Sequence, residues 1–446
     1  MSLITFEGWE NYSSFANVKP SINYNDAFAS HANAITLMTA TDANGVSPRN
    51  SGSCLKLISA TNNVNAYAKV LLTHPTNADH TTGTFGFAWY NFLPAGRTAA
   101  VHYATFVPIA AVVSSAGIPH FFIGVNSNNQ IELRRLIGST TFAFTSSRGN
   151  TSFTSNPSTY LWNQLFTHSS NCDKSSCVIT FPQFQASSYT LIGTASTNLC
   201  AENSWNFIEV QYSMSTTTSG FVRVKVNRAV GDATLDIDTT AANTVQGTLN
   251  VRSVMLGMAR GAQSTLYINY VHGENTTSNA QVYTQYYDDF YWLDSAGSSY
   301  NTFLGRVSCT KFRYDTMEQS TYTTPASSVT ALSNVTEVFA GPGSLTTRNI
   351  ANAGGQLLNM RVAAASSQTL APILVRQVAY GYRTDTVGDL TLGAIDGANE
   401  ITNIAVGLGT DSTNGGIVSR DYDNAPDGAE WTNAKIASTI FRHTAN

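Results

Sequence analysis

Charged side chains are scarce in this sequence. Asp, Glu, Lys and Arg make up 12% of its 446 residues, about half of the share of about 25% in an average soluble domain. The 24 Lys and Arg residues are spread along the chain, and the net charge is −4. Binding to nucleic acid or to anionic lipid needs a basic patch. We therefore expect no nucleic-acid partner and no membrane partner, and a surface rich in hydroxyl and amide groups.

Long apolar runs are also lacking. No segment approaches the ~20 apolar residues that a helix needs to span a bilayer. The segment from Met1 to Trp9 has neither the basic start nor the apolar stretch of an export signal. The sequence predicts a soluble protein without a readable export signal.

Cysteine is rare, and no two cysteines have CxxC spacing. Cys172, Cys177 and Cys200 lie closest together. One disulfide could join Cys172 to Cys177 or Cys177 to Cys200, all the thiols could be free, or a metal could bind, although only His168 is near enough to help. These alternatives stay open. A disulfide would imply eventual exposure outside a reducing cytosol.

Helical periodicity is nearly absent, and short runs that alternate between apolar and polar residues dominate. In 221–227 the valines share one face while Arg223 and Lys225 share the other, which is typical of a half-buried antiparallel strand. The same reasoning predicts strands at residues 84–90, 205–212, 266–271, 286–294 and 373–380. Residues 121–125 and 130–136 flank the turn Asn126–Asn129 and predict a hairpin. The fold class is therefore all-β.

Two changes in composition predict the domain boundaries. Residues 149–203 are rich in Ser, Thr and Asn, and indicate a long insertion within a first domain, residues 1–313. Residues 314–335 show no apolar alternation and predict a linker. The remaining residues, 336–446, predict a second, smaller β-sandwich.

The segment Tyr286–Asp294 is the most informative in the chain. It packs aromatic and acidic side chains into one alternating strand, and a turn rich in Ser and Gly leads to Phe303–Val307. We expect these residues to form two strands that close a sandwich.

The succession of motifs resembles one family. "WNFIEV" from Trp205, "GFVRVKVN" ending at Asn227, and "DDFYWLDSAGSS" leading into "FLGRV" are similar to concanavalin A-like (laminin G-like) jelly rolls of tailed-bacteriophage structural proteins. The chain departs from the family's pattern where Arg228 rather than Gly follows Asn227. The resemblance implies a large jelly roll followed by a small C-terminal β-sandwich.

The resemblance also implies a function. It indicates a non-enzymatic structural component of a tailed-phage virion, such as a head decoration, collar or tail-associated protein. Such a protein would be assembled in the host cytoplasm, and its partners would be other virion proteins and further copies of itself. The alternative is a carbohydrate-binding adhesin that recognises a host surface glycan, and a glycan hydrolase is a weaker third hypothesis.

Catalytic residues are not expected. Some concanavalin A-like folds are glucanases, which need two suitably spaced carboxylates, and Asp236-Ile-Asp238 is the best local candidate. The alternating Glu, Asp and Glu of the glucanase strand are missing, so we interpret this pair as a solvated strand edge. No Ser/His/Asp neighbourhood, phosphate-binding Gly loop or zinc spacing is present, and His74 with His80 is the closest histidine pair.

Asp288, Asp289 and Asp294 are a candidate calcium site, the one cofactor that the sequence suggests. Calcium prefers several oxygen ligands, and loop carbonyls follow at 295–298. Alternation would place Asp288 and Asp294 on one strand face and Asp289 on the other. The competing interpretation is that these carboxylates accept hydrogen bonds from turn amides near Gly297.

Aromatic side chains suggest either a core or a sugar-binding surface, because pyranose rings stack on Trp and Tyr. Phe85, Phe87 and Trp89 share one strand face and indicate core. We expect the second set, Tyr287, Phe290 and Trp292, to be divided between core and surface.

Overall fold

The computed structural model describes residues 3–9, 24–29, 35–49, 52–58, 68–74, 78–99, 106–115, 119–136, 145–146, 177–178, 189–197, 199–240, 244, 250–257, 284–295, 301–310, 314–321, 357–363, 365, 372–381, 389–407 and 416–445. The described residues up to Cys309 belong to one compact unit, unit 1, and those from residue 310 onward to another, unit 2. In these residues no helix is both long and apolar enough to cross a bilayer. The expected strand at 266–271 lies outside the described residues.

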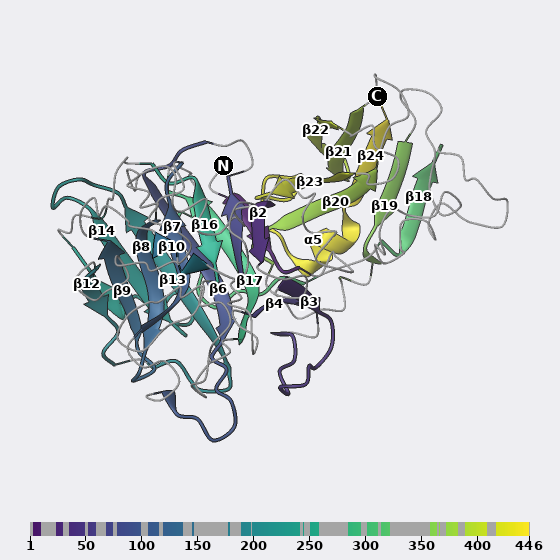
Figure 1. Ribbon diagram of the computed structural model, residues 1–446. Helices are drawn as coiled ribbons and strands as arrows, with labels where there is room; N and C mark the ends of the chain where they lie inside the picture. Colours follow the sequence, from purple (N-terminus) through teal and green to yellow (C-terminus); the bar gives the residue numbers. More distant parts are fainter. Residues whose placement is uncertain are drawn as a thin grey trace. The chain divides into compact units, whose positions relative to one another are not determined.

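The first sheet of unit 1 is antiparallel, and most of its strands are labelled in Figure 1. In spatial order they are β15 (Ile237–Asp238), β14 (Phe221–Val226), β13 (Trp205–Ser213), β6 (Thr82–Tyr90), β17 (Thr284–Asp294), β4 (Cys54–Ile58) and β3 (Ile35–Met38), with β1 (Leu3–Glu7) also paired to β17. The strands expected from alternation in this region are confirmed at β6, β13, β14 and β17.

The second sheet of unit 1 is also antiparallel. Its order is β12 (Tyr189–Thr194), β9 (Ile131–Leu136), β8 (Pro119–Asn126), β7 (Phe106–Val113), β16 (Ser253–Leu256), β5 (Ala68–Thr73) and β2 (Tyr24–Ala29). β8 and β9 form the expected hairpin. Asn129 adopts a φ of 58° in its turn, a conformation that Asn tolerates better than most residues.

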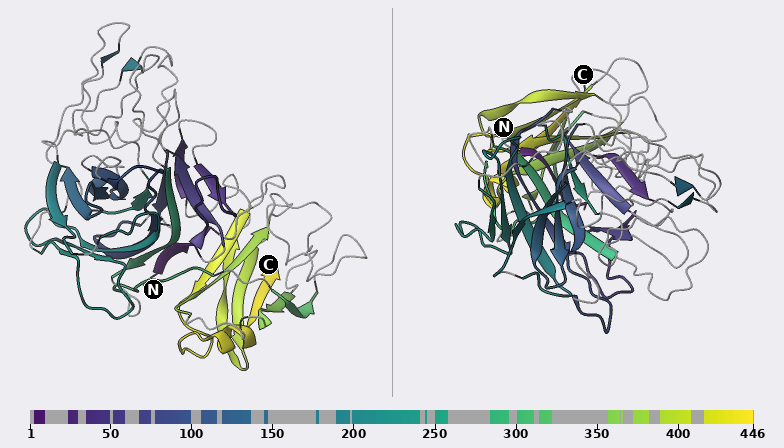
Figure 2. Two further views of the ribbon diagram at one scale, coloured as in Figure 1. Left: turned by 90° about the horizontal axis from the view of Figure 1, so that it is seen from below. Right: turned by 60° about the vertical axis from the view of Figure 1, so that its left-hand side comes forward.

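The two sheets pack face to face as a sandwich. Phe85, Phe87 and Trp89 are buried, which confirms that this face of β6 is core. Tyr287 of β17 reaches the second sheet, where its hydroxyl donates to the carbonyl oxygen of Ile109 at 2.7 Å. In the left-hand view of Figure 2 the strands of unit 1 curve around a shared interior. This is the jelly-roll architecture that the sequence predicts.

Strand β17 closes the first sheet, but it contains an irregularity. The register with β6 shifts between Asp288 and Tyr291, and Asp289 has a φ of 50°. Such a β-bulge inserts a residue and reverses which face the following side chains occupy. Asp288 pairs with Ala88, whereas Asp294 pairs with Gly83, so these two carboxylates lie on opposite faces. The expected shared face is therefore wrong.

The expected strand at Phe303–Val307 is also wrong. These residues form an irregular segment with no strand pairing, and Gly305 has a φ of 80°. The N–H groups of Leu304 and Gly305 each donate to Oε1 of Glu209 at 2.8 Å, and the hydroxyl of Tyr291 donates to the same oxygen. A buried carboxylate, rather than a neighbouring strand, satisfies this backbone.

The expected insertion is described only in part. Within 149–203 the structure describes residues 177–178 (β11, Cys177–Val178), 189–197 and 199–203. β11 pairs with β10 (Thr145–Ser146), and β12 is an edge strand that pairs with β9. The later part of the insertion therefore belongs to the sandwich itself.

Unit 2 is a smaller all-β unit with one short described helix. Its main sheet has the order β18 (Thr316–Ser320), β19 (Leu357–Arg361), β24 (Ile440–Ala445), β21 (Asp389–Asp396) and β22 (Asn399–Gly407), and β20 (Val375–Gly381) pairs with β23 (Gly416–Tyr422). β20 confirms the strand expected at 373–380. The segment expected to be a linker contributes β18 to this sheet.

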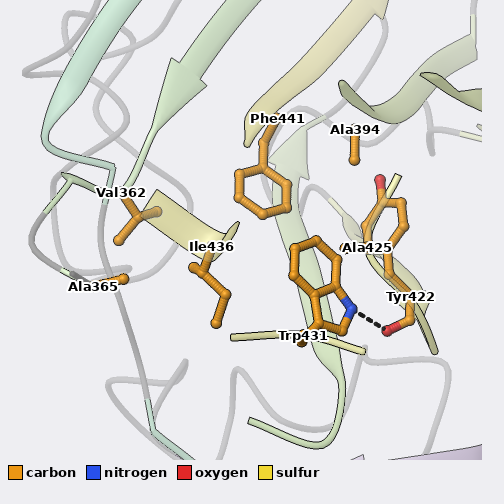
Figure 3. Packing of buried hydrophobic residues seen from close by; sticks show 8 residues of the cluster. All are labelled: Val362, Ala365, Ala394, Tyr422, Ala425, Trp431, Ile436 and Phe441. Carbon is orange, nitrogen blue, oxygen red and sulfur yellow. Dashed lines mark hydrogen bonds between the residues drawn. The ribbon is translucent and has the colours of Figure 1, made fainter. Parts of the chain in front are cut away.

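The core of unit 2 centres on Trp431. Its ring stacks on Phe441 at 6.4 Å between centroids, and its indole N–H donates to the carbonyl oxygen of Tyr422 at 3.0 Å (Figure 3). Ile436 of α5 (Asn433–Ser438) joins the same cluster. Thr432 caps this helix by accepting the N–H of Lys435. The all-β class, with a jelly roll followed by a smaller β-sandwich, is confirmed.

Candidate functional site

The acidic residues of β17 are engaged within the protein. Oδ2 of Asp289 lies 2.5 Å from a guanidinium nitrogen of Arg49, and its Oδ1 accepts the N–H of Cys309 at 2.6 Å. Oδ2 of Asp288 accepts the N–H of Arg49 at 3.2 Å. Both carboxylates are buried. They fix the segments around Arg49 and Cys309 to the strand, and the amides near Gly297 lie outside the described residues.

Asp294 lies in a different environment. Its Oδ2 is 3.9 Å from Nδ1 of His80, whose ring centroid lies 4.6 Å from that of His74. The bulge in β17 separates Asp294 from Asp288, so the three candidate calcium ligands are not brought together. Among the residues that the structure describes, no group of three His, Cys, Asp or Glu side chains is arranged to hold a metal.

The pair Asp236 and Asp238 is divided in the same way. The side chain of Asp236 is fully buried and accepts hydrogen bonds from the guanidinium of Arg228 and from the N–H of Val226. Asp238 faces solvent and lies 3.3 Å from Arg223. A solvated strand edge describes Asp238 but not Asp236, which holds the turn after β14.

Cys54 and Cys200 are free thiols. Cys54 and Cys200 are buried and Cys309 is partly exposed, so Cys200 forms no bond to Cys177. Burial raises the pKa of the Cys200 thiol to about 12, and the charge of Asp236 adds to the effect. A Cys172–Cys177 bond, and a metal site with His168, lie outside the described side chains.

One cluster of aromatic side chains is not part of the sandwich core. Tyr90 ends β6, Trp205 begins β13, and the two are directly opposite each other across the strand pair. Their ring centroids are 5.5 Å apart in an edge-to-face arrangement. Tyr286 lies 5.9 Å from Tyr90, and Phe92 lies 6.1 Å from Tyr286. We call these four residues the aromatic platform; it occupies the face of the first sheet opposite Phe85 and Phe87.

Exposure distinguishes the platform from the core. Tyr90, Phe92 and Trp205 are only partly buried, whereas Tyr286 beneath them is fully buried. Two exposed turns, 41–45 and 201–203, border the rings. The platform therefore presents aromatic faces next to open polar turns.

Hydrogen bonds fix the orientation of the platform rings. The indole N–H of Trp205 donates to the carbonyl oxygen of Ser47 at 3.1 Å, and the hydroxyl of Tyr90 donates to the carbonyl oxygen of Asn203 at 2.7 Å. The hydroxyl of Tyr286 donates to Asp42 at 2.8 Å and accepts from Asn44 at 2.7 Å. Hydrogen bonds at their edges thus hold the rings of Tyr90 and Trp205, which are partly exposed.

One ion pair supports the platform from below. Nζ of Lys56 lies 2.6 Å from Oδ2 of Asp42 and 5.6 Å from the centroid of the Tyr286 ring. Burial disfavours ionisation of Asp42, but hydrogen bonds from Lys56, from Tyr286 and from the N–H groups of Val46 and Asn44 outweigh it and lower the pKa of this carboxyl. Burial raises the pKa of Tyr90, and the charge of Asp42 raises it further.

This arrangement has the chemistry of a sugar-binding surface. Aromatic faces take the apolar face of a pyranose ring, while polar groups beside them bond its hydroxyls. Two amide atoms in the turns 41–45 and 201–203 are available to a ligand. Oδ1 of Asn44 and Nδ2 of Asn203 have no hydrogen-bond partner among the described residues.

Sequence reasoning missed the platform. Tyr287, Phe290 and Trp292, which we expected to be divided between core and surface, are all fully buried. A usable signal was present at Tyr90, which follows Trp89 and so falls out of phase with the inward-facing residues of β6. Trp205 carries the same signal only once its pairing with Tyr90 is known.

Comparison with known proteins gives a likeness of fold. No protein-family model matches the sequence, and no curated protein matches it. Among solved structures, the endo-β-1,4-glucuronan lyase of the fungus Trichoderma reesei is 12% identical over 61% of this chain and 95% of its own, with a TM-score of 0.34. The marine alginate lyase of Aplysia kurodai is 10% identical over 66% and 100%, with a TM-score of 0.39.

A third similar structure comes from a virus of bacteria. The carbohydrate esterase of the Shiga toxin-encoding bacteriophage phi24B is 8% identical over 66% of this chain and 98% of its own, with a TM-score of 0.30. All three are named as enzymes that act on carbohydrates. At these identities and scores the likeness bears on the β-sandwich fold and assigns no residue of this chain a role.

The expectation of a non-enzymatic protein is contradicted by this comparison, because lyases of alginate and glucuronan stand first among the similar structures. It rested on the resemblance to virion structural proteins and on missing catalytic motifs, and a few motifs do not represent the reactions that one fold accommodates. The comparison gives no support to a structural role in a virion.

Proposed function

We propose that this protein binds a glycan on the aromatic platform. The observation that carries the proposal is the cross-strand pair of Tyr90 and Trp205, whose rings are partly exposed at the end of a buried sheet. A glycan would stack on the ring faces and exchange hydrogen bonds with the amides of Asn44 and Asn203.

The platform is suited to binding because it is already in place. Hydrogen bonds to Ser47 and Asn203 hold the two rings, and the strands that carry them are fixed by the core on the opposite face. A ligand therefore does not have to order these side chains, which otherwise costs about 0.5–1.5 kcal/mol for each flexible side chain.

Screening on a glycan array, followed by isothermal titration with the best ligand, tests the proposal. Trp205→Ala removes the indole face, and we expect it to weaken binding by about tenfold or more. The estimate is by analogy with nucleobases, whose stacking on an aromatic side chain contributes about 1–3 kcal/mol. Trp205→Phe keeps an aromatic face but loses the N–H bond to Ser47, and it should retain most of the affinity.

Val230→Ala is the matched control, because Val230 is an exposed apolar residue in a turn outside the platform. It should leave binding unchanged. Failure of every glycan to bind, or equal affinities for Trp205→Ala and the unmodified protein, would refute the proposal. Assaying the same glycans for chain cleavage shows whether binding is accompanied by processing.

We further propose that the glycan-binding protein is carried on a tailed-phage virion as a host-recognition component. The motif succession at Trp205, Asn227 and Asp288 supports this placement. Other virion proteins and further copies of the chain would then be its partners. Mass spectrometry of purified particles provides the test: a fixed copy number per particle is expected, and absence from intact particles would refute the placement.

A further inference from the structure

We infer that the aromatic platform selects uncharged glycans over acidic ones. This inference rests on the proposed function and adds the class of ligand. It depends on which charges surround the rings and on whether any cation is left to receive a carboxylate or sulfate.

The two cationic side chains that support this face are already paired. Nζ of Lys56 lies 2.6 Å from Asp42, and its side chain is only 16% exposed. The guanidinium of Arg49 lies 2.5 Å from Asp289 and donates to the carbonyl oxygen of Val307. Releasing either cation to a ligand would leave a buried carboxylate without its partner, which is strongly unfavourable.

One anionic side chain lies at the open rim. Glu202 sits in the exposed turn 201–203, next to Asn203 whose carbonyl oxygen receives the Tyr90 hydroxyl. One of its carboxylate oxygens accepts from Asn129 at 2.7 Å, and no other protein group among the described residues bonds the carboxylate. Asp42 also acts on the rings, because its charge contributes to the raised pKa of Tyr90. Glu202 therefore places a negative charge at the rim that no described cation neutralises.

Apart from Glu202, the described polar groups at the rim are neutral. They are the amides of Asn44 and Asn203 and the hydroxyls of Thr41 and Ser47, which bond each other at 2.7 Å on the exposed side. Amides and hydroxyls pair well with sugar hydroxyls, whereas a carboxylate is bound best by a charged donor such as Arg. An acidic sugar would lose its hydration without gaining Lys56 or Arg49, because both are already paired.

Isothermal titration with two matched sets of oligosaccharides tests this inference. One set contains neutral hexose oligomers and the other contains uronic acid oligomers of the same length. We expect the acidic set to bind at least about tenfold more weakly at low salt, and the difference to shrink as salt screens the repulsion. Equal or tighter binding of the acidic set would overturn the inference and leave the proposed function standing.

Glu202→Gln provides the variant that isolates charge. Gln keeps an oxygen for the Asn129 amide but removes the negative charge at the rim. We expect acidic oligosaccharides to bind about two- to threefold more tightly to this variant, as is usual for one exposed charge, and neutral ones to be unaffected. Arg97→Ala, in the exposed turn 94–97, is the matched control, and it should change neither affinity. Loss of acidic binding in this control would show that Arg97 recruits anions and would refute the inference.

Discussion

Acid should destabilise unit 2 through one buried histidine, His443 of β24. Its side chain is 7% exposed, its ring lies edge-to-face with Tyr314 at 5.9 Å, and its Nε2 has no hydrogen-bond partner among the described residues. Burial without a compensating charge lowers the pKa of His443 from 6.5 to about 4. The imidazole is therefore neutral in the folded protein at pH values where it would be charged in the unfolded chain.

The size of the effect follows from this difference in pKa. Between pH 6.5 and pH 4 the unfolded chain binds a proton that the folded unit excludes, so stability falls as pH falls through this range. At about 1.4 kcal/mol per pKa unit the full loss is about 3 kcal/mol, a large share of the about 5–15 kcal/mol that holds a domain together. Above pH 6.5 the contribution is constant.

His443→Phe is the perturbation that isolates the effect. It keeps an aromatic ring beside Tyr314 and removes the group that titrates. Urea unfolding of the full chain is followed by fluorescence at several pH values, and the free energies of unfolding of the variant and the unmodified protein are compared. Because carboxyl groups titrate equally in both, their contribution cancels in the difference. We expect the variant to gain about 3 kcal/mol relative to the unmodified protein between pH 7 and pH 4.

The matched control is a change at His120, which belongs to unit 1 and whose Nε2 lies 2.8 Å from the carbonyl oxygen of Asn250. It should leave the transition of unit 2 unchanged. Parallel stability curves for His443→Phe and the unmodified protein would refute the reasoning. So would a His443 imidazole that titrates near pH 6.5 by nuclear magnetic resonance in the folded protein.

Three further predictions concern unit 1, each checked by urea unfolding. Arg49→Met should destabilise it by about 3–5 kcal/mol, because the buried Asp289 carboxyl loses the cation that compensates its burial; a loss below about 1 kcal/mol would contradict this, and Arg49→Lys is the control that retains charge. Gly86→Ala should cost about 1–3 kcal/mol, since a Cβ there overlaps the ring of Tyr291; unchanged stability would mean that the ring moves freely. Burial and the charge of His80 lower the pKa of His74, although the charge of Asp294 acts in the opposite direction. Unit 1 should therefore lose stability as pH falls below 6.5, and His74→Gln should reduce that loss.

The strands of unit 1 could be predicted because their signal is local. The alternation of β14 lies within six consecutive residues, and the turn at Asn129 needs only a residue that tolerates positive φ. The core face of β6 follows from the spacing of Phe85, Phe87 and Trp89 alone. No knowledge of distant residues is needed for any of these predictions.

The errors arose where one residue disturbs the alternation or where the partner is distant. The bulge at Asp289 changes the face of every later residue in β17. The residue types around Asp289 do not distinguish this segment from a regular strand. Phe303–Val307 has the composition of a strand, but Glu209, far away in the sequence, takes its N–H groups. Periodicity describes a regular element, and it cannot report a contact that interrupts one.

The aromatic platform also depends on contacts between distant residues that periodicity cannot predict. Its two exposed rings, Tyr90 and Trp205, meet only because β6 and β13 pair in one register, and a slip of one residue would turn Trp205 into the core. The groups that orient them, the backbones of Ser47 and Asn203, come from turns that are distant in sequence from the rings they hold. Because these acceptors are backbone carbonyls, the identity of neither residue reveals them. A glycan site of this kind is therefore determined by register and turn geometry, and it can be recognised only once both are known.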